Sequence, residues 1–218
     1  MVIDQFMSAV EPEFVAVPLE MPIMTREYYG GLYNSWVWYL AKNLSEFGFQ
    51  AFYPLVYFLP LYFMVGFGPS NPQLFFTMYL FFFLTQSSAT GLGYMISCLS
   101  SKAALTPILG VMSIMPLMLL GGLFLNTSMV PVYFSWLEFI SPIKYGFRGA
   151  CRAYWLSIGT IPCNANESCS AHSGQEVLQN LAMDKGSLGG DALFLVWINI
   201  LFRLIGIVAL HLRIRLQH

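Results

Sequence analysis

The residues best suited to chemistry in this sequence are a close cysteine pair, Cys163 and Cys169. Two thiols at this spacing form a disulfide or contribute to a metal site. The histidines are scattered and two of them lie at the C-terminus, so a disulfide is favoured over a metal site. Between the cysteines, Asn166 begins the tripeptide Asn-Glu-Ser, an acceptor for N-glycosylation. Both features indicate an oxidising, extracytoplasmic compartment for this stretch.

Other catalytic signatures are absent from the sequence. There is no Gly-Lys dipeptide, so a phosphate-binding loop of the form G-x-x-x-x-G-K-[ST] is excluded. There is also no H-E-x-x-H zinc motif. We therefore predict that the chain holds no catalytic residue, no metal ligand and no cofactor of its own.

The composition is that of an integral membrane protein. Of the 218 residues, 57% are hydrophobic and only 10% are charged, whereas soluble domains carry about 25% charged residues. The mean hydropathy is +0.63. A net charge of −1 gives no indication of nucleic-acid binding. The first ten residues lack the basic segment and apolar core of a signal peptide.

A helix needs about 20 apolar residues to span a bilayer. Four stretches meet this requirement: 47–67, 74–99, 103–125 and 192–212. They predict an all-α fold with four transmembrane helices. Short connections join the first three spans, and a long loop, residues 129–190, precedes the fourth.

Lysines and arginines alternate between the connections in a way that predicts the orientation. Basic residues precede the first span, separate the second span from the third and follow the fourth, at Arg26, Lys42, Lys102, Arg213 and Arg215. This pattern favours a multi-pass protein with both termini in the cytosol. Lys144, Arg148 and Arg152 in the long loop run against the rule, but charges in a long, separately folded segment weigh less. The long loop with its cysteine pair and its acceptor asparagine then lies on the opposite side.

The flanking segments have less regular patterns. Residues 1–16 are apolar with three acids and suggest the end of a preceding helix, with a disordered terminus as the alternative. Residues 17–46 predict an amphipathic helix at the inner membrane interface. Residues 129–158 suggest a re-entrant helical hairpin broken at Ser141-Pro142 and at Gly146, or an ordinary folded loop.

Two features inside the predicted spans suggest function. The third span carries methionines at 112, 115 and 118, which suit a surface that repacks around apolar ligands but also serve as ordinary filler. Arg203 lies midway along the fourth span, where a bare arginine costs about 2.5–3.5 kcal/mol. We expect Arg203 to bind a carbonyl or polar partner as a structural anchor; a substrate contact is the alternative.

Two motifs carry a resemblance to a known family. The run from Thr25 to Tyr33, continued by Tyr39-Leu40-Ala41-Lys42 and Glu46, resembles the signature of the white/ABCG subfamily of ATP-binding-cassette transporters. The run Ile140 to Phe147, the cysteine pair of the loop and Phe202-Arg203 are similar to the end of that family's membrane domain. The chain departs from the signature after Glu20 and after Glu46, which blurs the subgroup.

The resemblance implies roles for particular residues. Val111 and Met115 would line the substrate cavity, and Leu123 and Phe124 would form an apolar plug above it. Glu20, Arg26 and Glu27 would lie where the family contacts its ATPase domain. A second acceptor tripeptide begins at Asn126, and its closeness to the membrane predicts that it stays unused.

These observations lead to two hypotheses. The first is the membrane part of an ATP-driven exporter of lipids, sterols or other amphipathic compounds, working as a homo- or heterodimer. ATP and magnesium would then bind to nucleotide-binding domains supplied elsewhere. The alternative is a non-transporting truncated paralogue that dimerises with full-length subunits and regulates them.

Overall fold

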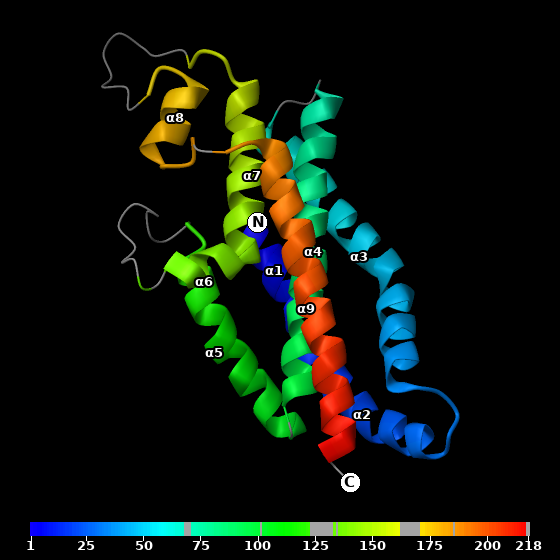
Figure 1. The fold of residues 1–218 in the computed structure, drawn as a ribbon. Helices are drawn as coiled ribbons and strands as arrows, with labels where there is room; N and C mark the ends of the chain where they lie inside the picture. The colour runs from blue at the N-terminus through cyan, green and yellow to red at the C-terminus, as the bar shows by residue number, and fades with distance from the viewer. Residues whose placement is uncertain are drawn as a thin grey trace.

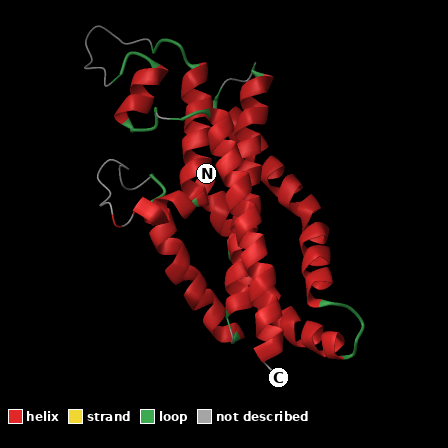
Figure 2. Ribbon diagram, viewed as in Figure 1, coloured by secondary structure: helices red, strands yellow, loops and turns green. Residues whose placement is uncertain are grey.

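A computed structural model describes residues 1–67, 71–100, 102–122, 133, 135–161, 171–184 and 186–216. The elements of these residues are helices, as Figure 2 shows. In chain order they are α1 (Val2–Val10), α2 (Glu13–Tyr29), α3 (Ser35–Val65), α4 (Pro72–Leu99), the 3-10 turn η1 (Ala103–Leu105), α5 (Thr106–Leu119), α6 (Ser135–Ile140), α7 (Pro142–Ser157), α8 (Gly174–Asn180) and α9 (Leu188–Leu216).

Helix α4 is the centre of the bundle and contacts α1, α2, α3, α5, α7 and α9 (Figure 1). Asn71 caps its first turn by accepting a hydrogen bond from the Leu74 amide at 3.3 Å, and Pro72 occupies the first helical position. From Thr85 to Tyr94 every residue is buried. Small and weakly polar residues there allow close approach, and the Ser88 hydroxyl donates to the Leu195 carbonyl of α9 at 3.3 Å.

Two of the described helices, α3 and α9, are long and apolar enough to cross a membrane. Helix α9 contains the predicted fourth span and extends beyond it, whereas α3 begins before the predicted first span and ends at Val65, two residues before the predicted end. Helix α3 begins at Ser35 and passes without interruption through Pro54 and Pro60. Figure 1 shows that α3 is bent, as expected of a helix that has lost backbone hydrogen bonds at two prolines. It ends at Gly66, whose φ of 73° is left-handed.

The predicted third span differs from the observed helix. The apolar helical stretch covers Ala103–Leu119 and so is shorter than the predicted range 103–125. A turn follows, and Gly122 has a φ of 80°, which favours glycine. The helix thus ends at Leu119, just before Gly121 and Gly122 and within the predicted span. Residues 123–125 of that range lie outside the described residues.

The predicted interfacial helix 17–46 is two elements rather than one. Helix α2 covers 13–29, a turn occupies 30–34, and the remaining residues form the first part of α3. Gly31 has a φ of 73°, and Asn34 accepts a hydrogen bond from the Ser35 amide at 3.0 Å. The glycine and the cap explain why the chain turns here.

The prediction that Gly146 breaks a helix is wrong. The helix breaks at Ser141, where Pro142 starts α7, and α7 continues through Gly146 to Ser157. A Cβ atom at Gly146 would lie 2.1 Å from the Thr85 hydroxyl oxygen of α4. The glycine therefore serves close helix packing. Helix α7 contacts both α4 and α9.

The elements divide between two ends of the bundle (Figure 1). The turn between α2 and α3, the connection from α4 to η1 and the C-terminus lie at one end. Helix α8, the start of α9, the end of α3 and the start of α4 lie at the other end.

Candidate functional site

The first charged cluster joins α2 to α3 at the end of the bundle that carries the C-terminus. The Lys42 ammonium lies 2.5 Å from Glu20 Oε1 and 3.1 Å from Glu46 Oε1. The Tyr94 hydroxyl of α4 donates to Glu46 Oε2. Lys42 and Glu46 are four residues apart on α3 and therefore share a face. One lysine thus connects a carboxylate from each of two helices.

The other two residues predicted to contact an ATPase domain lie at the end of α2. Glu27 accepts a hydrogen bond from the Tyr33 hydroxyl in the turn before α3. Burial, together with the neighbouring Glu27 carboxylate, raises the pKa of Tyr33 to about 12, so the phenol stays protonated at neutral pH. Arg26 is exposed in the last turn of α2. Glu20, Arg26 and Glu27 thus belong to one helix; Glu20 contacts α3 and Glu27 contacts the turn before it.

Arg203 lies at the interface of α9 with α3 and α4. Its guanidinium donates to Asn199 Oδ1 at 2.7 Å, to Ser87 Oγ at 3.1 Å and to Gln50 Oε1 at 3.3 Å. Ser87 Oγ also accepts from the Asn199 amide at 2.8 Å. These contacts connect three helices through polar groups, which is how a charged side chain is accommodated inside a membrane bundle.

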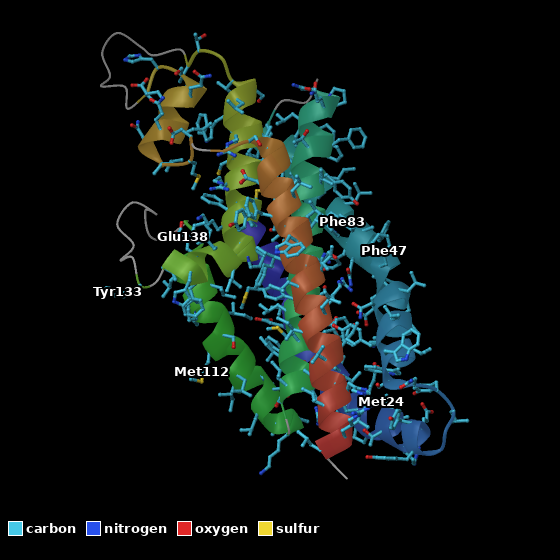
Figure 3. The ribbon with its side chains drawn as sticks, viewed as in Figure 1. Met24, Phe47, Phe83, Met112, Tyr133 and Glu138 are labelled. Carbon is cyan, nitrogen blue, oxygen red and sulfur yellow. The ribbon has the colours of Figure 1, made fainter. Side chains whose placement is uncertain are left out.

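The predicted substrate residues lie on an exposed face of α5. Val111 is 46% exposed and Met115 is 50% exposed. Met112 is 68% exposed, and Figure 3 shows its side chain directed away from the bundle. Within this chain they form an apolar surface, and enclosing it would require a second surface.

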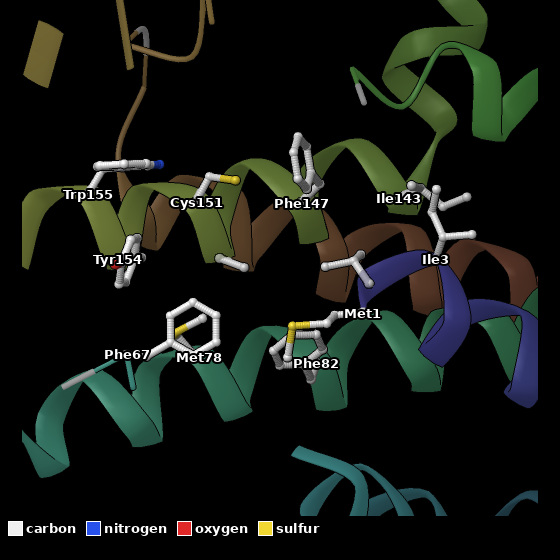
Figure 4. Close-up of a pocket in the computed structure, with 12 residues that line it drawn as sticks. Met1, Ile3, Phe67, Met78, Phe82, Ile143, Phe147, Cys151, Tyr154 and Trp155 are labelled. Carbon is white, nitrogen blue, oxygen red and sulfur yellow. The ribbon is translucent and has the colours of Figure 1, made fainter. Parts of the chain in front are cut away.

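An apolar pocket of about 400 Å³ lies elsewhere, between the start of α1, α4 and α7 (Figure 4). Its lining includes Met78, Phe82, Phe147 and Tyr154. Cys151 also lines it and is half-buried. Val111 and Met115 do not line this pocket. Sequence reasoning missed it because its residues come from helices far apart in the chain.

A second charged cluster joins α7 to α9 near the opposite end of the bundle. The Asp191 carboxylate is 1% exposed and accepts from Arg148 Nε at 2.9 Å and from Arg152 Nη1 at 2.5 Å. Arg152 also donates to the Met183 carbonyl at 2.6 Å. Asp191 stands in the first turn of α9, where a negative charge is favourable.

Several predicted residues lie outside the described residues. They are the plug residues Leu123 and Phe124, the cysteines Cys163 and Cys169, and the acceptor asparagines Asn126 and Asn166. Their proposed roles stay predictions.

The structure also contains buried polar residues that the sequence analysis did not single out. Glu13 is buried beside α3 and α4, and Gln50 is buried on α3. Asp191 is buried between two arginines. A charged or amide side chain inside an apolar stretch was the available signal in each case, but it did not reveal the partners.

Comparisons with known proteins show what the chain resembles. A family model described as "ABC-2 type transporter" matches residues 1–155. Protein white of Drosophila melanogaster is 31% identical over 198 residues, which are 90% of this chain and 29% of that protein. The ABC transporter ATP-binding protein/permease wht-1 of Caenorhabditis elegans is 27% identical over 209 residues, which are 93% of this chain and 31% of that protein.

A vertebrate relative gives a similar result. The broad substrate specificity ATP-binding cassette transporter ABCG2 of Bos taurus is 27% identical over 172 residues, which are 76% of this chain and 26% of that protein. The chain spans less than a third of the length of each of these relatives.

Proposed function

This chain belongs to the ABC-2 type transporter family of membrane proteins, and from that membership we propose that it forms the membrane part of an ATP-driven exporter of lipids, sterols or other amphipathic compounds. Its similarity to white/ABCG-type transporters supports transport over a purely regulatory role. The sequence has no phosphate-binding loop. ATP and magnesium would therefore bind to nucleotide-binding domains outside the residues of this chain.

The observation that carries the proposal is the exposed apolar face of α5. It presents Val111, Met112 and Met115 without covering them. An amphipathic ligand needs area and shape rather than a charged contact, and flexible methionines adapt to varied shapes. We infer that a second ABCG-type subunit, identical or not, faces this surface and that the substrate passes between the two.

The orientation follows from the distribution of charge. The end of the bundle with the α2–α3 turn and the C-terminus carries Arg26, Lys42, Lys102, Arg213 and Arg215, on its connections and helix ends. By the positive-inside rule this end would lie in the cytosol. There α2, with Glu20, Arg26 and Glu27, would meet the ATPase domain.

The opposite end would be extracytoplasmic. It would carry the disulfide between Cys163 and Cys169 and a glycan at Asn166. Helices α6 and α7 would form the re-entrant pair, and α4 and α5 would join α3 and α9 in crossing the membrane. The contacts of α7 with α4 and α9 support this arrangement, because backbone at membrane depth must be covered by protein.

Substitution Met115→Arg tests the substrate face. The chain would be expressed together with its ATPase domains, and efflux of a fluorescent lipid probe would be measured in intact cells. A charge on the apolar face should reduce export at least about tenfold, because an arginine strongly disfavours an apolar contact surface. Dimer assembly, measured by co-purification of differently tagged copies, should be unchanged.

Met64→Arg is the matched control. Met64 is 83% exposed near the end of α3, where a long basic side chain can reach the aqueous interface. It should leave export unchanged. Normal lipid export by the Met115→Arg protein would contradict the proposed substrate face.

A further inference from the structure

Two carboxyl side chains, Glu13 of α2 and Glu46 of α3, lie on the wall of a second cavity of about 320 Å³. The α1–α2 segment, α3 and α4 line this cavity, which contains no residue of the exposed α5 face. The Glu13 side chain is 9% exposed. A Cβ atom at Gly93 of α4 would lie 2.7 Å from the Glu13 Cβ, so α2 packs closely on α4 here. Glu13 is therefore enclosed at the junction of α2 with α3 and α4.

The two carboxyl groups differ in the donors that reach them. Glu46 accepts a hydrogen bond from the Tyr94 hydroxyl, and the Lys42 ammonium lies 3.1 Å from its other oxygen. Glu13 Oε2 is buried and receives no hydrogen bond from the described residues. The Glu13 side chain nevertheless forms a hydrogen bond with the Glu46 side chain. Ionised carboxylates only accept hydrogen bonds, so this one requires a proton on one of the two groups.

The surroundings of Glu13 favour its protonated form. Burial raises the pKa of Glu13 most, the Glu46 and Glu20 carboxylates raise it further and Lys42 lowers it, so that the pKa is about 8. Lys42 compensates Glu13 only weakly because it also lies 2.5 Å from Glu20 Oε1. The charged and titratable groups around Glu13 are Glu20 of α2, Tyr39, Lys42 and Glu46 of α3, Tyr94 of α4 and Arg203 of α9.

We propose that Glu13 and Glu46 form a proton-binding site, in which the Glu13 carboxyl group donates its proton to Glu46 and so joins the start of α2 to α3. Glu46 is the acceptor, because Lys42 and Tyr94 already donate to it. The proton supplies the donor that Glu13 otherwise lacks. When it is released to water, two neighbouring carboxylates remain at a buried site, and their repulsion drives α2 away from α3.

The bound proton makes the docking of α2 depend on pH. The pKa of Glu13 rises from an ordinary value of 4.5 to about 8 in the folded protein. Because the folded-state pKa is the higher one, the stability that the proton contributes is fully present below about pH 4.5 and is lost as the pH rises through about 8. Only the consequence for the ATPase domain, which α2 would meet, rests on the proposed function; the proton site does not.

A metal ion is a poorer partner for this pair than a proton. Among the residues that the structure describes, no group of three histidine, cysteine, aspartate or glutamate side chains is placed to hold a metal ion. Hard cations prefer six or more oxygen ligands. A proton needs only the two carboxyl oxygens that it joins.

The proton can be observed directly by infrared spectroscopy. The chain would be purified into lipid nanodiscs, and difference spectra between about pH 6 and about pH 9.5 would show the C=O stretch of a protonated carboxyl group. We expect a band that disappears with a midpoint near pH 8 and that is absent from Glu13→Gln. Glu11→Gln, which removes an exposed carboxylate two residues away, should keep the band and its midpoint.

A second variant tests whether the two carboxyl groups act as a pair. Glu46→Gln removes the negative charge beside Glu13 and leaves Lys42 in place. The midpoint of the Glu13 band should therefore fall by at least about one pH unit. Circular dichroism of all variants would check that the helices remain intact.

Hydrogen–deuterium exchange measures the docking of α2. Glu13→Gln keeps a donor for Glu46 at every pH, because its side-chain amide replaces the protonated carboxyl group. At about pH 9, the α2 amides should exchange several-fold faster in the parent protein than in Glu13→Gln. At about pH 6, the two proteins should exchange equally, because both then have the donor.

The outcomes that would overturn the proposal are distinct. A parent protein without the band, or a Glu13→Gln protein that keeps it, would assign the missing donor of Glu13 to a water molecule. An unchanged midpoint in Glu46→Gln would overturn the pairing, and equal α2 exchange at about pH 9 would overturn the link to docking. None of these measurements depends on lipid export, so failure here is distinguishable from failure of the transport proposal.

Discussion

Two charged clusters near opposite ends of the bundle differ in how their buried carboxylates are paired. Between α7 and α9, Asp191 receives hydrogen bonds from both Arg148 and Arg152, and Arg152 also reaches the Met183 carbonyl. Between α2 and α3, Lys42 binds Glu20 and Glu46, but Glu13 is buried with an oxygen that lacks a partner within the described residues. Both oxygens of Asp191 therefore have hydrogen-bond partners, whereas one oxygen of Glu13 has none among the described residues. We call the first cluster satisfied and the second open.

The two clusters differ in whether each buried carboxylate oxygen has a hydrogen-bond partner. A buried ion pair contributes little to stability compared with apolar residues of the same shape, but breaking one leaves an expensive uncompensated charge. The α7–α9 cluster therefore behaves as a fixed joint between two helices. The α2–α3 cluster instead gathers Glu20 and Glu46 around one lysine and places Glu13 beside Glu46 on the wall of a cavity.

Removing the carboxylate of the satisfied cluster should have the largest effect. Asp191→Asn removes the carboxylate that accepts hydrogen bonds from both arginines and leaves Asp184 as the remaining acid near Arg152. We expect a loss of about 3–5 kcal/mol in the free energy of unfolding. Thermal unfolding in detergent micelles would measure it. Glu11→Gln, at an exposed site away from the cluster, is the control. An unchanged midpoint for Asp191→Asn would show that the cluster does not hold the two helices together.

The joint also depends on the packing of α7 against α4. Gly146→Ala places a Cβ 2.1 Å from the buried Thr85 hydroxyl oxygen, so the two helices must separate. Overpacking of this kind costs about 1–3 kcal/mol. Gly159→Ala is the matched control, because a Cβ there meets no atom within 4 Å. The two unfolding midpoints should differ, and equal midpoints would contradict close packing at Gly146.

Neutralising the open cluster should have the smallest effect on stability. Glu13→Gln keeps the shape of the side chain, and Glu13 forms no ion pair with Lys42, whose partners are Glu20 and Glu46. The free energy of unfolding should therefore change by less than about 0.5 kcal/mol, or rise slightly. A loss as large as that of Asp191→Asn in the same unfolding assay would mean that both clusters are structural and that the comparison fails.

Much of the fold could be predicted from local sequence features. Apolar runs located the long helices, because hydropathy averaged over a span depends only on neighbouring residues. Ser141-Pro142 predicted the break before α7 correctly. The prediction failed at Gly146, because a glycine inside a helix is either a breaker or a packing site, and only the contact with Thr85 distinguishes them.

The candidate site was less predictable. The family resemblance directed attention to Val111 and Met115, which the structure places on an exposed surface of α5. Glu13 and Gln50, which line one cavity together, are separated by 37 positions in the chain. Such pairs depend on how helices pack, and no periodicity in either helix indicates which residues of the two will meet.

The sequence by itself determined that this is a helical membrane protein of the ABC-2 type transporter family, because composition and local motifs are read along the chain. Only the tertiary structure decided which charges are compensated. It joined Asp191 to two arginines 43 and 39 positions away and left Glu13 facing a cavity. The physical reason is that electrostatic compensation acts over a few ångströms in space, and a linear sequence does not specify those distances.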